Sequence, residues 1–328
     1  MIRILYHSSD GRLHLDWPVD ALASVLLDQK GFVWVDLVEE PRVTCEQILR
    51  DTFDFHPLAV DDALEETHVP KIDDWQDYVY LVLHAICPSA ASCDALTTLE
   101  LDCFIGPNYL VTYQSKEIHV IKNLWSGLDR NEHKFHQSAT RLLYVVADTL
   151  VMDTMRILEL LDEQIDGIED RIFAQPTNDL LAEMFTLKRT LLRLRRILSP
   201  QREVLNKLAR GDFAVINAED RIYFRDVYDH LVRLYDITDS MRDLVSGALD
   251  TYLSVVNNRM NDVMKTLTVI TTLFMPLSFL VGFFGMNFFQ SATLLPVWTG
   301  RLAFGITLAA MALIPVGMYL WMRKRAWL

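Results

Sequence analysis

The most informative pattern of apolar and polar positions lies between Asp250 and Asn287. The segment begins as a polar, helix-like sequence and passes without a break into residues 266–284, which are 19 residues without a charge. This length is close to the ~20 residues that a helix needs to cross a hydrocarbon core. Upstream, the only helix breaker between Tyr223 and Met275 is Gly247, so the pattern predicts one long stalk helix, residues 215–284, that continues into a membrane.

A second apolar segment follows after a short interval. Residues 302–322 are uncharged and stand between Arg301 and Arg323, which predicts a second membrane span over 301–322. The basic tail 323–328 comes next, and basic residues beside a span favour the cytoplasmic side. Two spans then place both termini and the soluble part in the cytoplasm, with only the loop 285–300 outside.

The N-terminal part mixes short apolar runs with breakers. Aromatic and β-branched runs predict strands at 31–37, 78–83, 99–105 and 109–113, and helical spacing predicts helices at 43–54 and 58–66. Residues 1–135 are therefore interpreted as a cytoplasmic α/β domain. The whole chain is predicted to be an α+β membrane protein with a long helical stalk and two C-terminal transmembrane helices.

Residues 136–210 have the pattern of two long helices, 139–173 and 180–208, joined by a turn at Pro176. The first carries an acidic exposed face and the second a basic run from Lys188 to Arg196. The basic run is open to two interpretations, a nucleic-acid patch or one half of an antiparallel hairpin with complementary charge. We favour the hairpin, because helices of opposite charge can pack side by side.

A polar seam runs along the stalk helix at alternating steps of three and four residues, the 3.5-residue repeat that keeps one face toward a common axis. Its members are Asp250, Ser254, Asn257, Asn261, Met264, Thr268, Thr271, Met275, Ser278, Gly282 and Gly285. Small and hydroxyl residues also line tight contacts between membrane helices. The amides and the carboxylate that extend the seam outside the apolar stretch favour a pore wall, which two spans per chain can build only as a ring of several copies.

Charge and composition narrow the function further. The formal net charge is −13, and residues 1–263 hold 26 basic and 44 acidic residues, since five of the 31 basic residues lie beyond them. Such acidity disfavours nucleic acid and favours cations. Neutral oxygen ligands in the seam suit a hydrated ion such as Mg²⁺. The sequence has no phosphate loop, nucleophile elbow or zinc-hydrolase histidine pattern, so we do not expect an enzyme.

Several motifs resemble the CorA family of divalent-cation channels. They are Phe284-Gly285-Met286-Asn287-Phe288 after the first span, Met275-Pro276-Leu277-Ser278-Phe279 within it, and the basic ending Arg323–Leu328. The resemblance implies a homopentamer in a bacterial or archaeal plasma membrane, which imports Mg²⁺, with Co²⁺ and Ni²⁺ as further candidates. Its partners would be divalent cations, membrane lipid and other copies of the chain.

The resemblance also implies roles for individual residues. Gly285, Met286 and Asn287 would form the selectivity loop. Asn261, Met264, Thr268, Met275 and Ser278 would line the pore, and the seam adds Thr271 to them. Asp250, Asp226 and Asp77 would bind regulatory Mg²⁺ between subunits and close the pore. Arg323, Lys324 and Arg325 would form a basic collar for gating.

One departure from the family pattern leaves the ion open. Residues 288–296, after Asn287, contain no acid, whereas Mg²⁺ members usually carry an acidic segment there. A transporter of the related ZntB type, carrying Zn²⁺ and coupled to protons, is the alternative. A membrane-anchored scaffold or sensor is a hypothesis of a different class.

Overall fold

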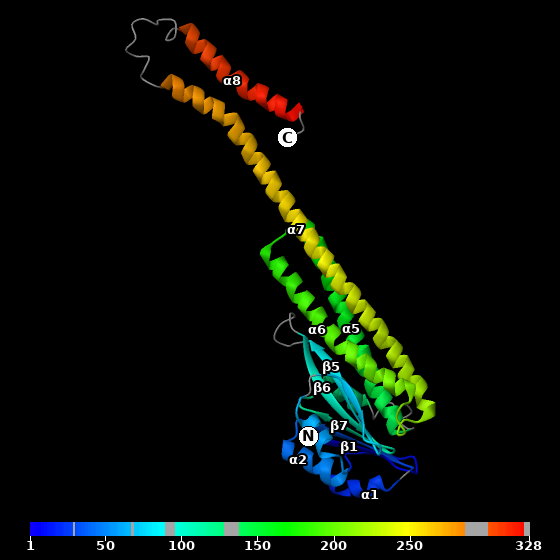
Figure 1. Ribbon diagram of the computed structural model, residues 1–328. Helices are drawn as coiled ribbons and strands as arrows, with labels where there is room; N and C mark the ends of the chain where they lie inside the picture. The colour runs from blue at the N-terminus through cyan, green and yellow to red at the C-terminus, as the bar shows by residue number, and fades with distance from the viewer. Residues whose placement is uncertain (29, 67–68, 89–95, 128–137, 286–300, 325–328) are drawn as a thin grey trace. The chain divides into compact units, whose positions relative to one another are not determined.

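The structure is a computed structural model, and it describes residues 1–28, 30–66, 69–88, 96–127, 138–285 and 301–324 (Figure 1). The chain divides into two compact units, Met1–Leu249 and Asp250–Leu328. The boundary falls inside helix α7 (Arg221–Gly285), a single element of 65 residues.

The first unit is built on a seven-stranded sheet in the order β2-β1-β3-β7-β6-β5-β4. The strands are β1 (Ile2–His7), β2 (Leu13–Leu15), β3 (Phe32–Val38), β4 (Lys71–Asp74), β5 (Val79–Pro88), β6 (Leu96–Ile105) and β7 (Tyr109–Gln114). Among the described strands, only β3 and β7 pair in parallel, with Val35 opposite Val111; the other ladders are antiparallel.

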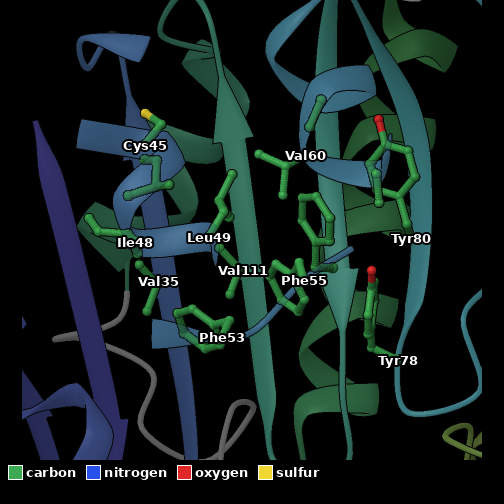
Figure 2. Close-up of a cluster of buried hydrophobic side chains, with 14 of the residues drawn as sticks. Val35, Cys45, Ile48, Leu49, Phe53, Phe55, Val60, Tyr78, Tyr80 and Val111 are labelled. Atoms are coloured by element: carbon green, nitrogen blue, oxygen red, sulfur yellow. The ribbon is translucent and has the colours of Figure 1, made fainter. Parts of the chain in front are cut away.

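Alternate side chains of these strands enter two different cores. One face packs against the short helices α1 (Leu22–Leu26), α2 (Arg42–Gln47) and α3 (Pro57–Leu64), with the π-helical turn η2 (Ile48–Thr52) between the last two. Figure 2 shows this core, which contains Leu49 and Phe55 together with the strand residues Val35, Val111 and Tyr80. The other face carries Trp34, whose ring stacks at 4.3 Å on Trp125 of α4 (His119–Gly127).

Two long helices complete the soluble unit together with the start of α7. Helix α5 (Ala139–Ala174) begins at Ser138, whose Oγ accepts a hydrogen bond from the Arg141 amide at 3.1 Å. Helix α6 (Asn178–Arg210) is capped by Thr177 and ends at Gly211, which has φ 72°. A glycine suits this left-handed position, because a side chain there is strained.

Helices α5 and α6 are antiparallel, as predicted, since Arg171 near the end of α5 pairs with Glu183 near the start of α6 at 2.8 Å. Among the described residues no ion pair joins the acidic face of α5 to the basic run of α6. Instead, apolar side chains such as Leu161 and Leu187 meet between the helices.

The predicted strands and helices of the first unit are present, with shifted ends, but three strands escaped prediction. The two edge strands are β2, whose three side chains are half-exposed or exposed, and β4, whose sequence is KIDD; β1, between β2 and β3, buries only Ile4 and Leu5 completely. Edge strands are commonly short or charged, which blocks pairing with other chains and removes the apolar signal. The helix predicted at 43–54 is divided into α2 and η2.

The second unit contains the remainder of α7 and helix α8 (Arg301–Lys324). Both continue as helices through their prolines, Pro276 and Pro315. Helix α7 agrees with the predicted continuous helix, and at 1.5 Å per residue it is about 95 Å long.

Candidate functional site: an exposed polar seam and free carboxylates

Helices α7 and α8 are the two described helices that are long and apolar enough to cross a membrane. In the most apolar stretch of α7, only 6 % of the residues are buried within the chain. In the corresponding stretch of α8, none is buried. The exposed fraction reaches 70 % for Phe279 and 77 % for Leu302. Such large apolar surfaces require lipid or other protein chains around them.

The predicted pore-lining residues lie on the exposed surface of α7. Asn261, Met264, Thr268, Thr271, Met275 and Ser278 are all exposed. The hydroxyls of Thr268 and Thr271 donate to the carbonyls of Met264 and Leu267, at 2.8 and 2.9 Å. A hydroxyl that donates to its own helix backbone keeps its oxygen lone pairs as acceptors. The threonines of the seam therefore present acceptors, the groups that the water shell of a cation requires.

The three predicted regulatory carboxylates are separate from one another in the chain. Asp77 lies in the turn between β4 and β5, Asp226 in the first part of α7 and Asp250 at the start of the second unit. All three are exposed, and no ion pair between described residues includes them. The described part of the chain also holds no group of three or more His, Cys, Asp or Glu residues that could bind a metal ion.

Part of the predicted site lies outside the described residues. This applies to Met286, Asn287, Arg325 and the loop beyond Gly285, which is the last residue of α7. Arg323 and Lys324, from the predicted basic collar, are the last two described residues of α8 and are exposed.

The sequence did not predict a group of hydrogen bonds and ion pairs that joins α6 to α7. The Arg195 guanidinium donates through Nε to the Tyr235 hydroxyl at 3.1 Å and lies 3.3 Å from an Asp239 carboxylate oxygen. Arg242 contacts the same carboxylate at 2.9 Å. The partners of Arg195 are at least 40 residues away along the chain, so no local pattern could have identified them.

The comparison with known proteins agrees with this arrangement. The model of the CorA-like Mg²⁺ transporter protein family matches residues 29–324. The chain belongs to the CorA family. It is 34 % identical over 302 residues to the cobalt/magnesium transport protein CorA of Thermotoga maritima, covering 92 % of this chain and 85 % of the relative. It is 32 % identical to the putative metal ion transporter YfjQ of Bacillus subtilis, covering 90 % of each.

A solved CorA structure has the same fold. The complete structure of the CorA magnesium transporter from Methanocaldococcus jannaschii matches with a TM-score of 0.83 and 23 % identity, over 99 % of this chain and 98 % of that one. A ZntB zinc transport protein from Yersinia pestis is 26 % identical over 276 residues, 83 % of this chain and 81 % of the relative.

The predicted family, the fold class and the absence of enzymatic chemistry are therefore confirmed. The chain is a divalent-cation transporter of the CorA family, with an N-terminal α/β soluble domain, a long helix and two candidate C-terminal membrane helices. The relatives of the ZntB type are more distant than the CorA proteins.

Proposed function

We propose that the protein is a homopentameric channel that imports Mg²⁺ across a bacterial or archaeal plasma membrane, with both termini in the cytoplasm. The observation that supports this most is the exposed seam on α7, from Asn261 to Ser278. Polar side chains on a membrane helix are costly when they face lipid. A ring of copies removes this cost, because it turns the seams of all subunits toward one water-filled axis.

The chemistry of the seam favours an ion that keeps its water. The wall offers amide, hydroxyl and thioether groups and, between Thr266 and Phe284, no charge. Mg²⁺ gives up its water reluctantly, so neutral acceptors along the wall can hydrogen-bond to the hydrated ion without replacing its ligands. In this proposal Gly285, Met286 and Asn287 form the outer entrance, where the Asn287 amide meets the first hydration shell.

Regulation follows from three carboxylates that form no ion pair with any described residue of their own subunit. Asp77, Asp226 and Asp250 are exposed, and the described part of one chain assembles no three-ligand metal group. A Mg²⁺ site built from them therefore needs ligands from two subunits. Bound Mg²⁺ offsets the repulsion between acidic domains and holds them in the closed ring. Loss of intracellular Mg²⁺ opens the pore, and the collar of Arg323, Lys324 and Arg325 moves with it.

Zn²⁺ transport is the second candidate, and the acid-free loop after Asn287 favours it. Weaker attraction at the outer mouth reduces the preference for a strongly hydrated ion, and Co²⁺ and Ni²⁺ then also become substrates. A scaffold or sensor without transport is the remaining hypothesis.

Ion flux into proteoliposomes tests the proposal. The full chain is reconstituted, and uptake of Mg²⁺, Co²⁺, Ni²⁺ and Zn²⁺ is measured with and without a pH gradient. We expect Mg²⁺ uptake that needs no pH gradient and is lost in Asn287→Ala. Uptake of Zn²⁺ alone, driven by protons, would establish the second candidate, and absence of any uptake would support the scaffold.

A further inference from the structure

A groove between α5 and the first part of α7 has acidic sides and an apolar floor. Its volume is about 400 Å³. Asp162 of α5 and Asp229 and Asp236 of α7 line it, with a single positive charge from Arg233. The floor includes Val232, Ile237, Met241 and Leu244, and half of the Leu244 side chain is exposed. An occupant of this groove must therefore be basic and partly apolar.

The outer face of α6 has these two properties. Phe185, Arg189, Leu192 and Arg196 follow one another at steps of four and three, so they form one stripe along the helix. All four are exposed, including 47 % of Phe185 and 38 % of Leu192. Arg193 lies beside the stripe and is also exposed. None of these arginines forms an ion pair with another described residue.

The stripe cannot reach the groove of its own chain. Leu187 and Thr190 line the contact between α6 and α5, and Arg195 contacts α7. At about 100° per residue, Arg189 lies roughly 200° around the helix from Leu187. The stripe therefore points away from α5, and its arginines Arg189 and Arg196 lie roughly 100–120° around the helix from Arg195, which contacts α7.

We infer that the groove receives the α6 stripe of a second copy of the chain. Carboxylates then meet arginines, and Phe185 and Leu192 cover the apolar floor. Because the two surfaces differ, each copy offers its groove to one neighbour and its stripe to the other. Contacts of this type close into a ring when the copies share one axis, as two membrane spans per chain require. The inference rests on the proposed oligomeric channel and specifies which surfaces join its subunits.

Disulfide cross-linking of the full chain tests the contact. Ser240→Cys places a thiol in the groove and Leu192→Cys places one in the stripe, both at exposed or partly exposed sites. We expect oxidation in liposomes to give a ladder of linked chains that ends at a closed ring. The matched control joins Leu192→Cys with Ser126→Cys on α4, also exposed, and should give about 10-fold less product. Equal yields, or products that stop at a dimer, would overturn the inference.

Exchanging the charges of the groove and the stripe tests whether electrostatic attraction between them holds the two chains together. Arg189→Asp with Arg193→Asp should lower the ladder about 10-fold, the effect of two ion pairs worth somewhat less than 1 kcal/mol each. Adding Asp162→Arg and Asp236→Arg to the same chain should restore it. If the exchange fails to restore the ladder in a chain that still folds and embeds, the proposed pairing is wrong.

Two further readouts separate the inference from its basis. If the reduced double-cysteine protein takes up Mg²⁺ but oxidation gives no ladder, the proposed contact is rejected and the proposed channel stands. If oxidation gives a ladder but there is no uptake, the contact stands and the channel is rejected. A bimane label on Leu192→Cys that is quenched by spin-labelled anionic lipid, with no cross-link, would assign the stripe to the bilayer surface and reject the contact.

Discussion

A buried carboxylate at the centre of the sheet provides a sharp test of the energetics of the soluble unit. Asp36 of β3 is completely buried. Its Oδ1 accepts hydrogen bonds from Thr112 at 2.7 Å and from Gln114 at 2.8 Å, and its Oδ2 lies 3.7 Å from Arg3. The side-chain oxygen of Gln114 in turn accepts a hydrogen bond from the Ile118 amide at 2.7 Å, so the network extends to the residue before α4.

Burial dominates the ionisation of this group. Removal from water raises the pKa of Asp36 from 3.8 to about 6, although the hydrogen bonds from Thr112 and Gln114 and the charge of Arg3 act in the opposite direction. A folded-state pKa above the unfolded one stabilises the protein fully below about pH 4. This stabilisation is lost as the pH rises through 6. The difference of about two pKa units corresponds to roughly 3 kcal/mol.

The Asp36→Asn variant removes this titration and nearly preserves the shape. We expect the unfolding midpoint of the wild type to fall by about 6–12 °C relative to the variant between pH 4 and pH 7, given 2–4 °C per kcal/mol for a unit of this size. Fluorescence of the full chain in detergent reports the transition, because Trp34 and Trp125 stack beside the network. Asp51→Asn, at an exposed site, is the matched control and should follow the wild type. If the unfolding midpoints of the wild type and of Asp36→Asn change equally with pH, the raised pKa of Asp36 does not control the stability of this unit.

Three further predictions concern the pore, its regulation and the helix connection. Ser278→Leu on the seam should lower Mg²⁺ flux at least about 10-fold through steric block, whereas Phe279→Leu, one position off the seam, should leave flux near the parent value; equal losses would place the pore elsewhere. Asp250→Ala should keep the channel open at internal Mg²⁺ concentrations that close the parent, and unchanged inhibition would remove Asp250 from the regulatory site. Gly211→Ala should lower the free energy of unfolding by about 1 kcal/mol or more, since φ is 72° and the new Cβ would also clash with the Arg221 side chain. An unchanged thermal midpoint would show that the loop shifts freely.

Much of the second unit could be predicted from the sequence, because its signals are local. The length of 266–284, the spacing of the seam and the basic residues after Met322 each depend on neighbours along one helix. Helical periodicity alone therefore gave the continuous helix through Pro276 and the exposed polar face. The metal roles of Asp77, Asp226 and Asp250 remain predictions, since they depend on a contact between chains.

The strand order could not be obtained in the same way. The pairing of β3 with β7 joins Val35 to Val111, 76 residues apart, and the cost of closing such a loop leaves no local trace in the sequence. The same holds for the Arg195–Asp239 contact and for the network around Asp36. Asp36 stood in the sequence as one polar residue in an apolar strand, and only the opposing strand supplies its hydrogen-bond donors.

The sequence by itself determined the two candidate membrane helices, the continuous stalk and the polar seam, because each follows from the length or the period of a single helix. Only the tertiary structure decided that the acidic and basic helices meet through apolar side chains and leave their charges exposed. The reason is physical. Burying a charge costs more than a surface ion pair returns, so helices pack through their apolar faces and keep charge on the surfaces available to other molecules.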